Sequence, residues 1–255
     1  MKTILRNTLK SITRAVGLDL GKLRKKNRPK LPNDLEIFNA NVFEQVSQFT
    51  MTSPERINAL VDAVQYVSRK GIEGAFVECG VWRGGSAMAA ALTFQRLEDF
   101  RDIYLYDTFE GMSAPTELDV SIHGNAASER FDELKIDENS SAWCASPLDE
   151  VKRNFTGTGY PIDLVHFIKG KVEDTIPAEI PQQISVLRLD TDWYESTKHE
   201  LTHLFPRLSK DGVLIIDDYG HWQGAKQAVD EYLSSNNIQL LLNRVDYTGR
   251  MAVNS

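Results

Sequence analysis

The stretch from Ile184 to Tyr219 constrains the fold more than any other part of this 255-residue chain. Two short apolar runs, 186–189 and 213–216, flank a segment at 196–208 whose leucines recur at helical spacing. Two strands joined by one helix pack as a parallel βαβ unit, so both runs end at the same edge of a sheet. The stretch therefore predicts an α/β fold in which helices pack on a parallel sheet.

Two aspartates follow each apolar run, Asp190 and Asp192 after the first and Asp217 and Asp218 after the second. Open α/β sheets bind ligands outside the carboxyl edge, and carboxylates gathered there repel one another unless a cation lies between them. Hard oxygen ligands in a partly open site suit Mg2+ or a similar divalent ion. The alternative is that these aspartates only cap helices and form turns. An acidic pair after each of two neighbouring strands favours the metal site.

A glycine-rich turn at 80–85 follows another predicted strand, 75–79, and precedes a helix of small residues. Glycine there lets the backbone approach a ligand closely beside a helix N-terminus. The spacing matches neither the dinucleotide fingerprint nor a P-loop. Glu78 before the first glycine and Asp107 at the end of the next strand form a pattern that binds S-adenosylmethionine, in which the second acid accepts hydrogen bonds from the ribose hydroxyls. A tight turn without a ligand is the simpler alternative.

The other elements follow from periodicity and turn residues. A helix with Ser53 as its N-cap is expected to begin at Pro54, and another is expected at 224–233. The remaining strands are predicted at 103–106, 164–168, 238–243 and 247–253.

Four segments, 77–86, 107–111, 189–197 and 216–220, together resemble the motifs of the macrocin O-methyltransferase family, in order, between about residues 51 and 232. Members of that family are S-adenosylmethionine-dependent, divalent-metal-dependent enzymes that methylate sugar hydroxyls of natural products. The resemblance implies a Rossmann-like class I methyltransferase fold. Its sheet would be mainly parallel and seven-stranded, with the last strand antiparallel and helices on both faces.

The resemblance also implies roles for individual residues. The metal ligands would be Asp190, Asp217 and Asp218. The cofactor pocket would contain Thr52, Glu78, Cys79, Gly80, Arg83, Gly84, Gly85, Ser86, Asp107, Gly111, Val172 and Glu173, the last two beside the adenine. Asp190 is also the expected catalytic base, because it can touch both the metal and the hydroxyl, with His221 and His123 as alternatives.

The expected function is S-adenosylmethionine-dependent, Mg2+-assisted O-methylation of a sugar hydroxyl in a glycosylated natural product or a polysaccharide precursor. A sugar hydroxyl is a very weak acid, and a metal bound to it lowers its pKa and directs its oxygen. Trp193 and Tyr194 could stack on the sugar ring. One alternative is a catechol-like phenol acceptor, which would call for a lysine base near Asp190. Another is a non-catalytic module that binds S-adenosylmethionine, which the intact acids argue against.

Residues 1–34 are predicted to be a basic arm and linker, and residues 35–255 a methyltransferase domain with a polar lid insertion at about 110–150. Residues 1–30 carry ten basic residues and one acid, a charge of +9 that leaves about −16 for the remainder. Apolar residues at helical spacing among these basic residues predict an amphipathic helix. Such a helix could make peripheral contact with an anionic membrane, pack on a protein partner, or lie in solvent.

Composition excludes several classes of protein. A net charge of −7 argues against a nucleic-acid binder, which needs a basic face. Cys79 and Cys144 form no disulfide framework, no apolar run reaches the length of a bilayer span, and no secretory signal is present, so a cytoplasmic protein is expected. The expected partners are a small-molecule or glycan substrate and further copies of this chain in a homo-oligomer.

Overall fold

A seven-stranded sheet with the order β3-β2-β1-β4-β5-β7-β6 forms the centre of the computed structural model, which describes residues 31–255. Its strands are β1 (Ala75–Cys79), β2 (Ile103–Asp107), β3 (Val165–Lys169), β4 (Ile184–Leu189), β5 (Leu208–Ile216), β6 (Asn243–Arg244) and β7 (Arg250–Val253). Strands β1 to β5 are parallel, and β7 is antiparallel to both β5 and β6. The strand order reverses between β1 and β4, so the ligand-binding crevice is expected at their carboxyl ends.

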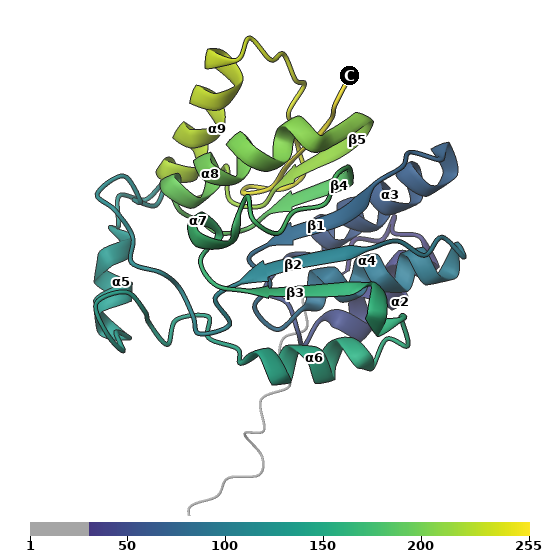
Figure 1. Ribbon diagram of the computed structural model, residues 1–255, viewed down its shortest axis with the longest axis horizontal. Helices are drawn as coiled ribbons and strands as arrows, with labels where there is room; N and C mark the ends of the chain where they lie inside the picture. The colour runs from purple at the N-terminus through teal and green to yellow at the C-terminus, as the bar shows by residue number, and fades with distance from the viewer. Residues whose placement is uncertain (1–30) are drawn as a thin grey trace, which may run out of the picture. The chain divides into compact units, whose positions relative to one another are not determined.

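Helices cover both faces of the sheet (Figure 1). One group contains α2 (Ile37–Val46), α3 (Pro54–Lys70) and α4 (Gly85–Arg96), which pack on one another. The other face is covered by α8 (Tyr194–Leu204) and α9 (Gln223–Ser235), with the short α7 (Val172–Thr175) beside α8. The remaining helices are α5 (Ala127–Glu133), α6 (Leu148–Thr156), and the 3-10 turns η2 (Ile162–Leu164) and η3 (Phe205–Arg207).

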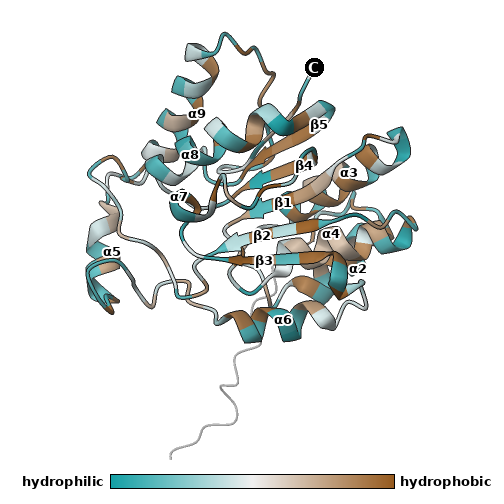
Figure 2. Ribbon diagram, in the orientation of Figure 1, coloured by the Kyte–Doolittle hydropathy of each residue, from teal (hydrophilic) through white to brown (hydrophobic). Residues whose placement is uncertain are grey.

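The central strands are buried on both faces, because helices lie on each side of them. All residues of β1 and β4 are buried, and alternate side chains of β4, including Leu187 and Leu189, pack against Leu201 and Leu204 of α8. Figure 2 shows hydrophobic colour over most of these strands and hydrophilic colour on the outer surfaces of the helices. Residues 32–255 form one compact unit around this core.

The predicted fold class, the seven strands and the antiparallel last strand are confirmed. The late strands are shorter than predicted: Ile238, Leu240 and Leu242 pack on the core without joining a ladder. The helix predicted at 196–208 ends earlier, at Leu204, since Pro206 interrupts it, and β5 begins at Leu208.

The segment at about 110–150, which is predicted to be a lid, lies beyond the ends of the parallel strands, and α5 is its main regular element (Figure 1). Helix α6 follows α5 and begins at Leu148, near the end of this segment. The predicted basic arm at 1–30 lies outside the described residues. Among the helices at 31–255, none is both long enough and apolar enough to cross a membrane.

Candidate active site

Two adjoining cavities open at the carboxyl ends of the parallel strands. The first is lined by five residues predicted for the cofactor pocket, together with Asp190; these five are Gly80, Asp107, Gly111, Val172 and Glu173. The second has a volume of about 410 Å3 and is lined by Thr52, Ser86 and all four aspartates of the two acidic pairs. Residues that are far apart in the sequence therefore meet at the predicted edge of the sheet.

Gly80 allows the turn after β1 to pass close to the turn after β4. Its φ is +84°, and a Cβ added there would lie 2.0 Å from the carbonyl oxygen of Asp190. The Asp190 amide donates to the carbonyl of Cys79 at 2.9 Å, which joins the two turns directly. No residue with a side chain fits at position 80 without displacing the backbone that carries Asp190.

Asp107 is held at the end of β2 by backbone amides. Its Oδ2 accepts hydrogen bonds from Val81 N at 2.7 Å and Trp82 N at 2.9 Å, and its Oδ1 accepts one from Phe109 N at 2.7 Å. Burial raises the pKa of Asp107, while these three hydrogen bonds to the ionised form oppose the rise. The carboxylate is thus fixed beside the glycine-rich turn, and its remaining lone pairs can accept hydroxyl donors.

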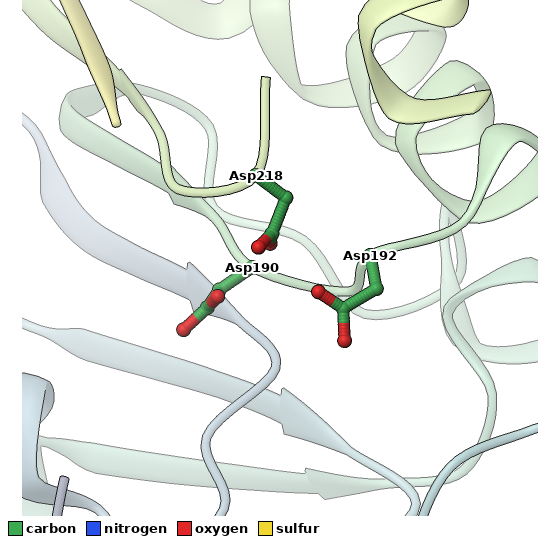
Figure 3. Close-up of side chains that lie close together, drawn as sticks. All are labelled: Asp190, Asp192 and Asp218. Carbon is green, nitrogen blue, oxygen red and sulfur yellow. The ribbon is translucent and has the colours of Figure 1, made fainter. Parts of the chain in front are cut away.

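Asp190, Asp192 and Asp218 form a cluster at the ends of β4 and β5. One carboxylate oxygen from each lies within 4.8 Å of the other two, and Figure 3 shows the three carboxylates close together. Asp218 Oδ2 is buried and has no hydrogen-bond partner among residues 31–255. Burial and the neighbouring carboxylates raise the pKa of Asp192 to about 7 and that of Asp218 well above its ordinary range. A divalent cation fits this donor set and would relieve the repulsion.

Asp217, predicted as a metal ligand, lies outside this cluster. Its Oδ1 accepts a hydrogen bond from Arg188 at 2.5 Å, and its Oδ2 pairs with Arg56. Asp192 is the third member of the cluster, and its backbone is left-handed (φ +70°). The Asp-x-Asp spacing was the available signal for Asp192.

Arg188 is the centre of a buried ionic network that the sequence did not reveal. Its side chain is 2% exposed, and Nη1 donates at 2.6 Å both to Glu78 Oε1 and to Asp190 Oδ2, while Nη2 bonds Asp217 and, at 3.2 Å, Thr52 Oγ1. Burial raises the pKa of Glu78 to about 7, against the lowering influence of Arg188. Glu78 is buried and lines neither cavity; its contact with the site is the ion pair with Arg188.

Several other predicted cofactor residues also act from outside the cavities. Cys79 is fully buried. Arg83 turns toward α6, where it pairs with Glu150 at 2.7 Å. Gly84 is the left-handed N-cap of α4, and a Cβ at Gly85 would lie 2.6 Å from the carbonyl oxygen of Phe49. These glycines shape the turn but do not line the cavities.

Tryptophans form one wall of the second cavity. Trp143 and Trp222 line it and meet Trp193 edge to face, with ring centroids 5.7 Å and 5.1 Å from that of Trp193. Trp193 and Tyr194 are buried and line neither cavity, so the expectation that they stack on a sugar is wrong. Trp143 and Trp222 line the second cavity, although Trp222 is itself only 8% exposed. His221 also lines this cavity, and its ring meets that of Trp222 edge to face.

This strand order, with a glycine-rich turn after β1 and an acid ending β2, defines the class I methyltransferase fold. The chain belongs to the macrocin O-methyltransferase family (TylF), whose model matches residues 41–252, and it is an O-methyltransferase.

Named relatives cover most of the chain. The 8-demethyl-8-(2,3-dimethoxy-alpha-L-rhamnosyl)-tetracenomycin-C 4'-O-methyltransferase of Streptomyces olivaceus is 36% identical over 78% of this chain and 73% of its own length. The mycinamicin III 3''-O-methyltransferase of Micromonospora griseorubida is 34% identical over 78% of this chain and 76% of its own. The solved structure of the O-methyltransferase NovP aligns with a TM-score of 0.69 at 31% identity, over 81% of this chain and 82% of that one.

Proposed function

We propose that this O-methyltransferase transfers the methyl group of S-adenosylmethionine to a sugar hydroxyl, with the assistance of Mg2+ or a similar divalent cation. The acceptor is a glycosylated natural product or a polysaccharide precursor. The observation that carries the proposal is the cluster of Asp190, Asp192 and Asp218 at the mouth of a cavity that adjoins the glycine-rich turn. Of the two relatives named above, one is named for methylation of a rhamnosyl tetracenomycin and the other for methylation of mycinamicin III, which supports this acceptor class.

S-adenosylmethionine suits the first cavity because of the chemistry of its lining. Asp107 offers carboxylate lone pairs for the ribose hydroxyls, and Gly80 and Gly111 line the same cavity. Val172 and Glu173 line the same cavity and are proposed to flank the adenine. Thr52 lines the second cavity, where it is proposed to reach the methionine part.

The three clustered carboxylates are proposed to hold the cation, which when bound lowers the pKa of a coordinated hydroxyl. Asp217 remains a predicted ligand, although its two oxygens are occupied by arginines in the described structure. The unpartnered Oδ2 of Asp218 and the raised pKa of Asp192 support a cation at the cluster.

Proton removal is assigned to Asp190. Of the three clustered acids, it alone lines both cavities, so it lies where the methyl donor and the hydroxyl are proposed to meet. Arg188 bonds its Oδ2 and so fixes the direction of the carboxylate. Asp192 is the second candidate, because a pKa of about 7 suits a general base near neutral pH. Alignment of the donor and the acceptor supplies much of the remaining rate.

No described contact favours a phenol acceptor. Lys198, the nearest lysine on the following helix, is exposed and donates to Tyr194 Oη at 2.9 Å instead of reaching Asp190. A reducing, cytoplasmic setting is retained in the proposal, since Cys79 and Cys144 are both free. A homo-oligomer and peripheral membrane contact through residues 1–30 remain predictions.

The proposal is tested by incubating the full chain with S-adenosylmethionine, Mg2+ and a panel of rhamnosides and other glycosides, and by following the mass of each acceptor. We expect a gain of one methyl group that is lost in EDTA, restored by added Mg2+, and absent in Asp218→Asn. The matched control is Glu133→Gln, an exposed lid acid paired with Arg130, which should methylate like the wild type. Methylation that continues undiminished in EDTA would refute the metal role.

A further inference from the structure

Asp119 is a fully buried lid residue (0% exposed) that lines neither cavity. Its Oδ1 accepts a hydrogen bond from the backbone amide of Tyr194 at 2.8 Å. Its Oδ2 accepts from Thr116 N at 2.7 Å and from Thr116 Oγ1 at 2.9 Å. A carboxylate is costly to bury, and these three donors offset that cost. The side chain thus joins the lid to the residues that follow the acidic cluster.

The contact with Tyr194 caps a helix from a distant part of the chain. Tyr194 is the first residue of α8, and the N-cap residue, Trp193, makes no capping hydrogen bond through its side chain. Asp119 supplies the missing acceptor and places a carboxylate at the positive end of the helix. Gly224 leaves the room for it, since a Cβ there would lie 2.4 Å from Asp119 Oδ1.

The turn before α8 needs such support, because Asp192 adopts a left-handed backbone conformation with φ +70°. This conformation is unfavourable for a residue with a side chain and persists when its surroundings hold it. The lid holds the two residues that come next. Trp193 Nε1 donates to the carbonyl of Ser113 at 3.1 Å, and Tyr194 N donates to Asp119.

The same lid segment also contacts the second acidic turn. Ile122 N donates to the carbonyl of His221 at 2.8 Å, and Gln223 N donates to the carbonyl of Val120 at 2.9 Å. The amide of His221 in turn donates to the carbonyl of Asp218 at 2.9 Å. Lid residues 113–122 therefore contact both of the turns that carry the clustered acids.

We propose that Asp119 is a positioning residue, which fixes the turn of Asp190 and Asp192 from the lid and so sets the geometry of the carboxylate cluster. The inference rests on the proposed role of that cluster in holding a cation and the acceptor. It assigns the lid a structural part in the reaction: the insertion whose residues 111, 112, 143 and 144 line the second cavity also supports, through residues 113–122, the acids beside that cavity.

The test compares Asp119→Ala with Thr116→Val, which removes one donor to the other oxygen of Asp119 and leaves the contact with Tyr194 in place. Hydrogen exchange is measured by mass spectrometry without metal or cofactor. In Asp119→Ala, we expect peptides covering residues 190–197 to exchange at least about tenfold faster than in the wild type, while β1 peptides do not change. In Thr116→Val, peptides covering residues 190–197 should exchange at the wild-type rate. Unchanged exchange at 190–197 would overturn the inference, whether or not the chain methylates sugars.

Binding and turnover separate positioning from general damage to the fold. In Asp119→Ala, calorimetry should give a cofactor affinity within about twofold of the wild type. In turnover, either the Mg2+ concentration needed for half-maximal rate should rise by about 10- to 100-fold, or kcat should fall by the same factor. If Asp119→Ala does not fold, Asp119→Asn carries the test, and it should show a smaller change in the same peptides. An equal loss of protection throughout the domain in either variant would overturn the positioning role. If no acceptor is methylated at all, the proposed function fails but the exchange result still stands.

Discussion

Replacing Arg188 with methionine should destabilise the domain strongly, because it leaves three acids without their shared partner. The guanidinium is 2% exposed and pairs with Glu78 at 2.6 Å, Asp190 at 2.6 Å and Asp217 at 2.5 Å. Breaking a buried ion pair on one side costs about 3–5 kcal/mol. For a domain of this size, that corresponds to a fall of about 6–20 °C in Tm.

The loss should grow with pH, because burial raises the pKa of Glu78 to about 7 from an ordinary value of 4.5. Between pH 4.5 and about 7, the folded wild type therefore binds more protons at Glu78 than the unfolded chain does. Its free energy of unfolding falls as the pH rises from 4.5 to about 7 and is constant at higher pH. Without Arg188, the pKa of Glu78 rises further. The free energy of unfolding of the variant then continues to fall above pH 7, by up to about 1.4 kcal/mol per pH unit.

Urea unfolding at pH 5, 7 and 8 measures both effects. The control is Arg130→Met, which removes an exposed pair with Glu133 and should change the free energy of unfolding by no more than about 1 kcal/mol. If Arg188→Met were within about 1 kcal/mol of the wild type at all three pH values, the ionic network would not support the site as described.

Three further predictions concern the cavities. Gly80→Ala should abolish cofactor binding in calorimetry, because its Cβ would lie 2.0 Å from the Asp190 carbonyl oxygen, whereas Gly71→Ala, with nothing within 4 Å, should still bind. Asp107→Ala should weaken S-adenosylmethionine binding by about tenfold or more, because a charge-assisted hydrogen bond is worth about 1.5–3 kcal/mol; an unchanged affinity would remove Asp107 from the ribose site. The affinity for Mg2+ should rise by about tenfold from pH 6 to pH 8, because the pKa of Asp192 is raised to about 7 and cation binding displaces the proton; titration calorimetry that gives equal affinities would contradict this.

The sequence predicted the parts of the fold that local pattern controls. The apolar runs of β1, β2, β4 and β5, each followed by glycine or aspartate, lie where they were expected. Helix α2 was not predicted, because its N-cap, Glu36, makes no capping hydrogen bond and its sequence has little amphipathic pattern. Strand β6 is only two residues long and is joined to β7, so pairing and not propensity decides its limits.

The acidic edge of the site was also predictable, but its internal arrangement was not. Glu78 and Arg188 are directly opposite each other in the β1–β4 register, a pairing across 110 positions that no local pattern reveals. The exchange of Asp192 for Asp217 in the cluster depends on one left-handed residue and on two arginines that occupy Asp217. The contact of Asp119 with α8 depends on how the lid folds back, which sequence spacing does not specify.

The most direct test is a crystal structure of the full chain with S-adenosylmethionine and Mn2+, which replaces Mg2+ and scatters anomalously. We expect an anomalous peak in contact with Asp190, Asp192 and Asp218, on the side of the cluster that faces the sulfonium methyl. A peak at another place, or carboxylates turned away from the cofactor sulfur, would contradict it.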